Sequence, residues 1–302
     1  MSKVIILTGP TASGKSSLAV EFGRKYRNID IINADSMQVY SELPILCANP
    51  LAEDYLAVGH KLYGFLLASE QMSAGKWIEM IDIEIRKTIN EGRVPILVGG
   101  SSMYIRRLID GIRAVPNVSK DVRDLVKNRF DNLGRDRFFD ELVVRDPLVG
   151  DRLHKNDTQR ILRACEVLEQ TGNSFFSDFG RSKSILSDFD LVKVVLLPDV
   201  DAVYHACDSR FLDMVEAGVV DEVADFMSKS YSENLSATKA TGCQEIMSFL
   251  RGEISLDFAI EKSQQSTRNY AKRQRTWFKN GFEDFNFLAK KSLDDFEKIV
   301  NL

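Results

Sequence analysis

The stretch that most constrains the fold is GPTASGKS, at residues 9–16. It has the pattern G-x-x-x-x-G-K-[ST], and an apolar run at 4–7 and a helical pattern after residue 16 give it a strand–loop–helix setting. In such a loop, backbone N–H groups and a helix N-terminus hold phosphates, the lysine adds a charge, and the serine hydroxyl holds Mg²⁺. We therefore predict a P-loop NTPase-like α/β fold, a parallel sheet flanked by helices, with a phosphate ligand at Gly9, Pro10, Thr11, Ala12, Ser13, Gly14, Lys15 and Ser16.

Composition excludes several classes of protein. The chain has 302 residues, 44% of them hydrophobic and 28% charged, so it can bury a large core. Its net charge of −4 argues against a uniformly basic nucleic-acid binder, and its four cysteines are too far apart to suggest a zinc site. The run at 4–7 is too short for a signal peptide, and no apolar stretch reaches membrane length. We expect a cytoplasmic protein with no membrane contact.

A carboxylate follows the second predicted strand. Residues 30–34 (DIINA) read as a buried strand that delivers Asp35, Ser36, Met37 and Gln38 at its carboxyl end. Ligands of parallel α/β sheets bind at that edge, so Asp35 is a candidate catalytic group. An Asp-Ser pair also commonly caps a turn, and the sequence leaves both roles open for Asp35.

The next strand, at 94–98, ends in Gly99, Gly100 and Ser101. Many P-loop NTPases have an aspartate there to assist the metal. The two glycines either admit a backbone or a base at close range or simply form a tight turn. The missing aspartate argues against a kinase. A nucleotide or small-molecule kinase and a non-catalytic RNA-binding module nonetheless remain as alternative functions for a chain with this phosphate loop.

Among the remaining core segments, residues 44–70 read as loop and 73–91 as a helix. A strand is predicted at 191–197, one amphipathic helix at 212–226, and a loop carrying Lys239 at 235–245.

The strand–helix alternation lapses between 113 and 190. Residues 120–169 hold eleven Lys/Arg and eleven Asp/Glu, which indicates a mixed-charge surface. We predict a core formed by 1–112 and 191–302, and a mostly helical insertion at 113–190.

Within that insertion a helix is predicted to begin at 156–157. Arg160 and Arg163 lie in its first turns, where a cation costs on the order of 0.3–1 kcal/mol unless an anion binds. Gln159 and Arg163 share a face that suits either a phosphate or a flipped base, or else simply faces solvent.

The segment 262–279 contains six Lys/Arg and no acid, with Tyr270, Trp277 and Phe278 interleaved. A helix with one sign of charge suits a polyanion, such as a pyrophosphate or an RNA backbone. An exposed solubilising helix would normally include glutamates.

Together these motifs resemble one family. GPTASGKS, INADSMQVY, VPILVGGSSMYI, NDTQRILRACEV, ATGCQE and STRNYAKRQRTWF occur in the order and spacing of the bacterial tRNA dimethylallyltransferase (tRNA isopentenyltransferase) family. The resemblance covers nearly the whole chain. It implies transfer of a dimethylallyl group from dimethylallyl pyrophosphate to the exocyclic amine of the adenosine 3′ to the anticodon, in tRNAs reading codons that begin with U. We expect the enzyme to act as a monomer with Mg²⁺.

The resemblance also assigns residues. It implies that Asp35 is the catalytic base, that Lys15 and Lys239 act on the pyrophosphate, and that Ser16 holds the metal. It implies that the anticodon stem-loop of the tRNA, clamped by the insertion, is contacted by Asp35, Ser36, Met37, Gln38, Ser101, Arg123, Gln159, Arg160, Ile161, Leu162 and Arg163. The chain has Lys239 where the family has an arginine, which removes a two-pronged contact to the leaving group.

Overall fold

The computed structural model describes residues 1–70, 72–111, 114–180, 182–229, 231 and 235–302. Its sheet is entirely parallel in the order β3-β2-β4-β1-β5-β6. The strands are β1 (Lys3–Thr8), β2 (Ile29–Asn33), β3 (Gly59–Lys61), β4 (Val94–Gly99), β5 (Asp190–Leu196) and β6 (Asn286–Leu288). The predicted α/β fold with a parallel sheet is confirmed. Every residue of β2 and all but the first residue of β4 are buried, as expected for apolar strands covered on both faces.

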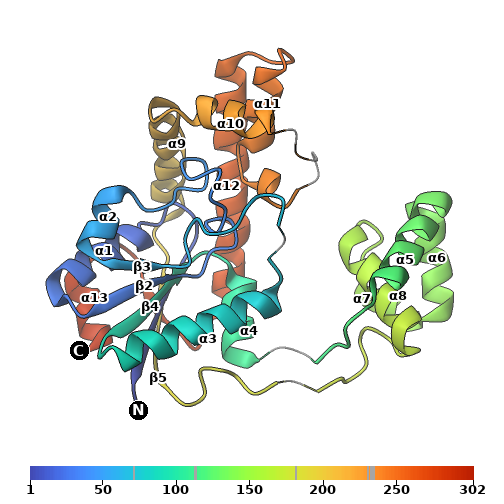
Figure 1. Ribbon diagram of the computed structural model, residues 1–302, viewed down its shortest axis with the longest axis horizontal. Helices are drawn as coiled ribbons and strands as arrows, with labels where there is room; N and C mark the ends of the chain where they lie inside the picture. Colours follow the sequence, from blue (N-terminus) through green and yellow to red (C-terminus); the bar gives the residue numbers. More distant parts are fainter. Residues whose placement is uncertain (71, 112–113, 181, 230, 232–234) are drawn as a thin grey trace. The chain divides into compact units, whose positions relative to one another are not determined.

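Helices cover both faces of the sheet. The first, α1 (Lys15–Tyr26), and the last, α13 (Leu293–Val300), pack on one face, where Phe22 and Phe296 meet edge to face at 5.1 Å. The other face carries α3 (Ala74–Asn90), whose buried stripe includes Trp77, Ile81 and Ile85. Figure 1 shows the strands between these two layers.

A group of helices gathers beyond the carboxyl ends of the strands (Figure 1): α9 (Val200–Glu216), α10 (Val219–Ser228), α11 (Cys243–Leu250) and the long α12 (Leu256–Gly281). The single helix predicted at 212–226 is wrong, because Gly218 takes a left-handed φ of 94° and begins a second helix there. Periodicity continues across such a break, so it could not reveal the bend.

Several short helices and strands were not predicted from the sequence. The predicted loop 44–70 contains α2 (Ala52–Ala57) and strand β3, and the chain after α12 adds β6 and α13. Three-residue strands carry too few residues for alternation to show. The basic helix at 262–279 is confirmed as part of α12, while α4 (Ser102–Asp110) follows β4.

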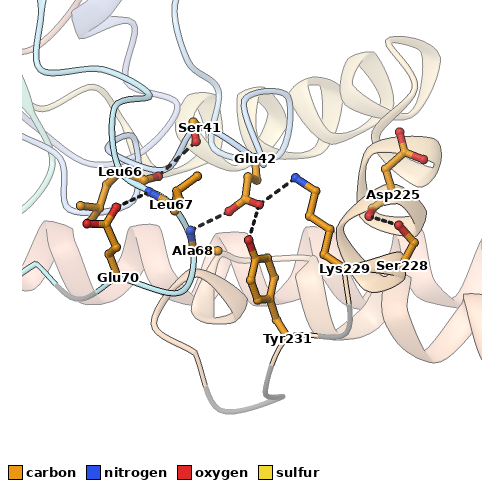
Figure 2. Close-up of polar contacts among 10 residues, drawn as sticks. All are labelled: Ser41, Glu42, Leu66, Leu67, Ala68, Glu70, Asp225, Ser228, Lys229 and Tyr231. Atoms are coloured by element: carbon orange, nitrogen blue, oxygen red, sulfur yellow. Dashed lines mark hydrogen bonds and ion pairs between the residues drawn. The ribbon is translucent and has the colours of Figure 1, made fainter.

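A buried carboxylate holds the segment after β2 in place. Glu42, whose side chain is 5% exposed, accepts hydrogen bonds from the amide of Ala68, the ammonium of Lys229 and the hydroxyl of Tyr231, at 2.6–2.8 Å (Figure 2). It therefore ties the chain after Asp35 both to the approach to α3 and to the end of α10.

A second carboxylate acts on the same segment. Glu222, in α10, accepts from the amides of Ile45 and Leu46 at 2.7 and 2.9 Å. Burial raises the pKa of Glu222, and these two amides oppose that rise. The segment 41–48 is thus anchored at Glu42 and at the amides of Ile45 and Leu46, which fixes the part of it that lines the cavity described below.

The chain divides into two compact units, Met1–Ile109 with Ile185–Leu302, and Asp110–Ser184. The predicted boundary between 112 and 113 lies outside the described residues. The second unit is helical, with α5 (Lys120–Leu133), α6 (Arg135–Arg145), α7 (Pro147–Arg152) and α8 (Thr158–Thr171) around a core that includes Phe138, Leu142 and Ile161. Among the described residues, no helix is long and apolar enough to cross a membrane.

Candidate active site

The loop between β1 and α1 has the geometry of a phosphate cradle. Gly14 has a φ of 89°, which an L side chain rarely adopts, and a Cβ on Gly9 would lie 2.3 Å from the carbonyl oxygen of Leu196. The buried hydroxyl of Ser13 has no hydrogen-bond partner within the described chain. A buried donor without a partner is costly, so the loop is suited to an anion that would accept from it.

A cavity of about 110 Å³ opens beside this loop. Its polar lining includes Thr11, Lys15, Ser16, Asp35, Gln38, Arg210, Thr267 and Tyr270, and its apolar lining includes Met37, Leu46, Phe211, Met214 and Ala240. A charged group and a hydrocarbon group can therefore both be accommodated in it.

Two cations line the polar part. Burial lowers the pKa of Lys15 to about 8, although Asp35 nearby favours its charged form. The guanidinium of Arg210 donates a 2.7 Å hydrogen bond from Nη2 to the Thr11 hydroxyl, and burial lowers the pKa of Arg210 as well. Two partly buried cations at one cavity suit a ligand that carries several negative charges.

Arg210 was missed by the sequence analysis. It lies in α9 within HACDSRFLDM, where Cys207, Phe211 and Met214 form the buried face. A lone arginine next to such a face was the available signal, because an unpaired cation is rarely placed there without a purpose.

Asp35 lies at the carboxyl end of β2, where it caps the turn that follows and also lines the cavity. Its Oδ1 accepts from the amide of Met37 at 2.9 Å, which caps the turn, and its Oδ2 accepts from the amide of Gly100 at 3.3 Å. The same carboxylate lines the cavity. Asn33 orients the turn, since its side-chain oxygen accepts from the Asp35 amide at 2.7 Å.

The two glycines that end β4 allow close approach of other groups. A Cβ on Gly99 would lie 2.0 Å from the backbone of Ala34, and one on Gly100 would lie 2.6 Å from Nε2 of Gln274. Gln274, buried in α12, accepts from the Thr11 amide and donates to the Gly100 carbonyl, both at 2.8 Å. This one side chain therefore connects the phosphate loop to the end of β4.

A second hollow, of about 290 Å³, lies beyond β4. It is lined by Ser36, Gly100, Ser101, Ser102, Met103, Tyr104, Tyr270, Arg273, Gln274 and Trp277, and it shares Tyr270 with the first cavity. Ser101 accepts from the amide of Ser36 at 2.9 Å, so the two predicted RNA contacts are joined. Asp35, bonded to Gly100, is adjacent to both spaces.

Met37 and Gln38 line the first cavity as well, and Gln38 donates to the carbonyl of Ala48 at 2.6 Å.

The position of Lys239 differs from the one that the resemblance implies. It is exposed and is absent from the described lining, to which its neighbours Ala240 and Thr241 contribute instead. The turn Ala237–Lys239 buries Ala237 and Thr238 and leaves Lys239 exposed to solvent, whereas Arg210 lines the cavity.

The predicted RNA contacts of the second unit lie in two helices, α5 and α8. Asp157 caps α8 by accepting from the Arg160 amide at 3.3 Å, which confirms the predicted helix start. Gln159, Arg160 and Arg123 of α5 are exposed.

The remaining three predicted contacts, Ile161, Leu162 and Arg163, interact within the unit. Ile161 is fully buried in its core, so a direct contact of Ile161 with RNA is wrong, and Leu162 packs partly against the same core. The helix period that exposes Gln159 and Arg160 turns Ile161 inward. Arg163 pairs with Glu166 at 3.0 Å.

The parallel sheet has a phosphate loop, two cations and a carboxylate at its carboxyl edge. This arrangement is that of a P-loop protein with a site for a phosphorylated ligand. A model of the IPP transferase family matches residues 38–281. The chain belongs to this family.

Individual proteins agree with the family assignment. A tRNA dimethylallyltransferase of Ehrlichia canis is 43% identical over 293 residues, 96% of each chain, and one of Wolbachia pipientis wMel is 41% identical over 93% of each. The crystal structure of a Bacillus halodurans tRNA isopentenylpyrophosphate transferase aligns with a TM-score of 0.69 and 28% identity, covering 100% of this chain and 94% of the other. A eukaryotic dimethylallyltransferase solved acting on tRNA aligns with a TM-score of 0.82 and 25% identity, covering 100% of this chain and 77% of the other.

Proposed function

We propose that this protein transfers a dimethylallyl group from dimethylallyl pyrophosphate to the exocyclic amine of the adenosine 3′ to the anticodon, in tRNAs that read codons beginning with U. The curated relatives are enzymes named for dimethylallyl transfer to tRNA. The observation that carries the proposal is the position of Asp35, which lines the cavity beside the phosphate loop and is bonded to Gly100 of the second hollow.

The first cavity suits the donor. Its pyrophosphate would accept from the loop amides, Ser13, Lys15 and Arg210, while the apolar lining takes the hydrocarbon. As the allylic C–O bond breaks, negative charge grows on the leaving pyrophosphate, and fixed cations stabilise that charge without reorganising.

The second hollow suits the acceptor. An adenine flipped out of the anticodon loop would enter beside Ser36, Ser101 and the half-exposed Trp277, whose ring offers a stacking surface. The amine nitrogen attacks the allylic carbon, pyrophosphate leaves, and the Asp35 carboxylate takes the proton that the nitrogen loses.

Magnesium fits the residues present. Ser16 lines the cavity, and Mg²⁺ is usually held by one or two protein oxygens together with substrate phosphates. Ser16 would therefore hold the ion, which would neutralise charge on the pyrophosphate when bound. Within the described residues there is no cluster of three His, Cys, Asp or Glu side chains suited to a metal, so the phosphates would supply the other ligands.

The two rival functions fit less well. Many P-loop NTPases have a metal-assisting aspartate at the end of a core strand, but β4, which pairs with β1, ends in Gly99 and Gly100 instead. A non-catalytic RNA-binding module would have no use for a cavity lined by Lys15, Arg210 and the carboxylate of Asp35 together.

The second unit serves, in this proposal, as the clamp for the anticodon stem-loop. Its exposed Arg123, Gln159 and Arg160 provide contacts to RNA. We propose that the protein acts as a cytoplasmic monomer, since one chain supplies both hollows.

One reaction tests the proposal. The protein is incubated with an unmodified anticodon stem-loop, dimethylallyl pyrophosphate and Mg²⁺, and the digested nucleosides are analysed by mass spectrometry. We expect one dimethylallyl group per stem-loop, on the adenosine next to the anticodon, with no consumption of ATP. ATP hydrolysis or phosphorylated RNA would indicate a kinase, and unmodified nucleosides would favour the binding module.

A further inference from the structure

The apolar part of the donor cavity is a wall with a packed core behind it. Leu46, Phe211, Met214 and Ala240 line the cavity, and all four belong to one buried cluster formed by α9, α10, α11 and the segment after β2. Phe211 is 2% exposed and is the largest of these side chains.

Phe211 follows Arg210 directly in α9. Arg210 bonds the phosphate loop through Thr11, so the helix presents a cation to the phosphate end and an aromatic ring to the hydrocarbon end of the same cavity. Met214, one helical turn further on, continues the apolar wall.

The ring of Phe211 is held from behind by a glycine. A Cβ on Gly242 would lie 2.6 Å from Cε2 of Phe211 and 3.4 Å from Cδ1 of Leu46, and Gly242 has a φ of 96°. The backbone of Gly242 therefore packs directly against the ring. Since the core behind the wall is closely packed, the ring cannot retreat to admit a longer hydrocarbon.

We infer that Phe211 sets the upper limit on the length of the prenyl donor, so that the enzyme accepts dimethylallyl pyrophosphate and excludes the geranyl homologue. This inference rests on the proposed function, and it adds the residue that determines donor specificity. Phe211→Ala removes a ring about as large as one isoprene unit, and the space it leaves is continuous with the donor cavity.

The test is a competition. Equal concentrations of dimethylallyl and geranyl pyrophosphate are supplied with excess stem-loop, and the ratio of the two prenylated nucleosides is measured. The wild type should form almost only the dimethylallyl product, and Phe211→Ala should raise the geranyl share at least about tenfold, because extra methylenes in an apolar pocket change selectivity by 10- to 200-fold. Phe211→Leu should shift the ratio in the same direction but less.

Two further variants separate specificity from stability. Phe226, 3% exposed in α10, belongs to the same cluster but does not line the cavity, so Phe226→Leu should destabilise the fold while leaving the product ratio unchanged. Gly242→Ala should push the ring into the cavity and raise the KM for dimethylallyl pyrophosphate without any gain for geranyl. Thermal unfolding identifies variants that fail to fold, and Phe211→Leu replaces Phe211→Ala if the latter does.

The outcomes are distinct. If folded Phe211→Leu and Phe211→Ala make dimethylallyl product with the wild-type ratio, Phe211 does not limit the donor and the inference is overturned. If Phe226→Leu shifts the ratio equally, general loosening of the core explains the change and the inference also fails. If the wild type itself forms no prenylated nucleoside, the proposed function fails first.

Discussion

Nη2 of Arg210 lies 2.7 Å from the hydroxyl of Thr11, a hydrogen bond between residues 199 positions apart. It connects α9 to the phosphate loop and places a guanidinium at the donor cavity. Asp208, two residues earlier in the same helix, pairs with Arg268 of α12, so the helix that carries Arg210 is itself held by its neighbour. Arg210 is therefore positioned before any ligand arrives, which is the condition for effective charge stabilisation.

Replacing Arg210 should impair the reaction more than replacing Lys239. Arg210→Gln removes a charge-assisted contact worth roughly 1.5–3 kcal/mol, so kcat/KM for the donor should fall about 10- to 100-fold. Lys239→Ala should stay within about twofold of wild type, because Lys239 is exposed and does not line the described cavity. Steady-state kinetics with varied donor measures both. A large loss in Lys239→Ala with a normal Arg210→Gln would reverse the assignment.

The contrast between these two residues shows what sequence patterns can predict. The phosphate loop, Asp35 and the Gly99–Gly100 turn depend on local context, and the structure places all three at one edge of the sheet. Arg210 reaches that edge only through the packing of α9, which local patterns do not encode. Gln274, which joins the loop to β4, was hidden in the same way.

The conformation of single turns sets a second limit on what can be predicted from the sequence. Whether Lys239 points inward or outward depends on one turn at Ala237–Lys239, and the resemblance to an arginine-containing motif could not fix that turn. The break at Gly218 likewise depends on a single left-handed residue within a continuous apolar period.

The charge state of Lys15 predicts a pH dependence. Its pKa is lowered by burial from 10.5 to about 8, so between these values the unfolded chain binds a proton that the folded, donor-free protein does not. The free energy of unfolding should therefore rise with pH across this window in the wild type relative to Lys15→Met. Donor affinity should fall as pH rises above about 8, because the cation that holds the pyrophosphate is lost. Denaturant titrations and donor binding at pH 7 to 10 measure both, and parallel pH curves for the two proteins would contradict the prediction.

The ionised carboxylate of Glu42 should stabilise the fold at pH values above its pKa. Burial pushes its pKa up, but Lys229, the Ala68 amide and Tyr231 outweigh burial and hold it below 4.5 (Figure 2). The contribution of Glu42 to the free energy of unfolding should thus be fully present at neutral pH. It should be lost as the pH falls from the pKa of Glu42 in the unfolded chain through its lower pKa in the folded protein. Glu42→Gln should cost about 1–3 kcal/mol at pH 7 and much less near pH 3.

The control for this prediction is Glu253→Gln, since Glu253 is exposed. Chemical unfolding at both pH values gives the comparison. An equal loss at pH 7 and pH 3 would mean that the charge of Glu42 is not what holds the segment.

RNA binding should depend on salt through exposed cations of α12. Arg268 and Arg275 already bond Asp208 and the Pro198 carbonyl, whereas Lys272 and Lys279 are exposed. If the last two contact phosphates, each alanine variant should lower the slope of log affinity against log salt by roughly 0.7–0.9. Donor binding should not change. Fluorescence anisotropy of a labelled stem-loop at several salt concentrations measures the slopes, and unaltered slopes would place the RNA elsewhere.

The central claim is that Asp35 takes the proton from the attacking amine, and single-turnover kinetics of Asp35→Asn test it most directly. Asparagine keeps the shape of the side chain and can still accept from the Met37 amide, but it cannot act as a base. With saturating donor and prebound stem-loop, the rate of dimethylallyl transfer should fall by about 10²–10⁴ while the affinity for RNA stays within about threefold of wild type. A transfer rate within a few-fold of wild type would show that Asp35 only caps its turn.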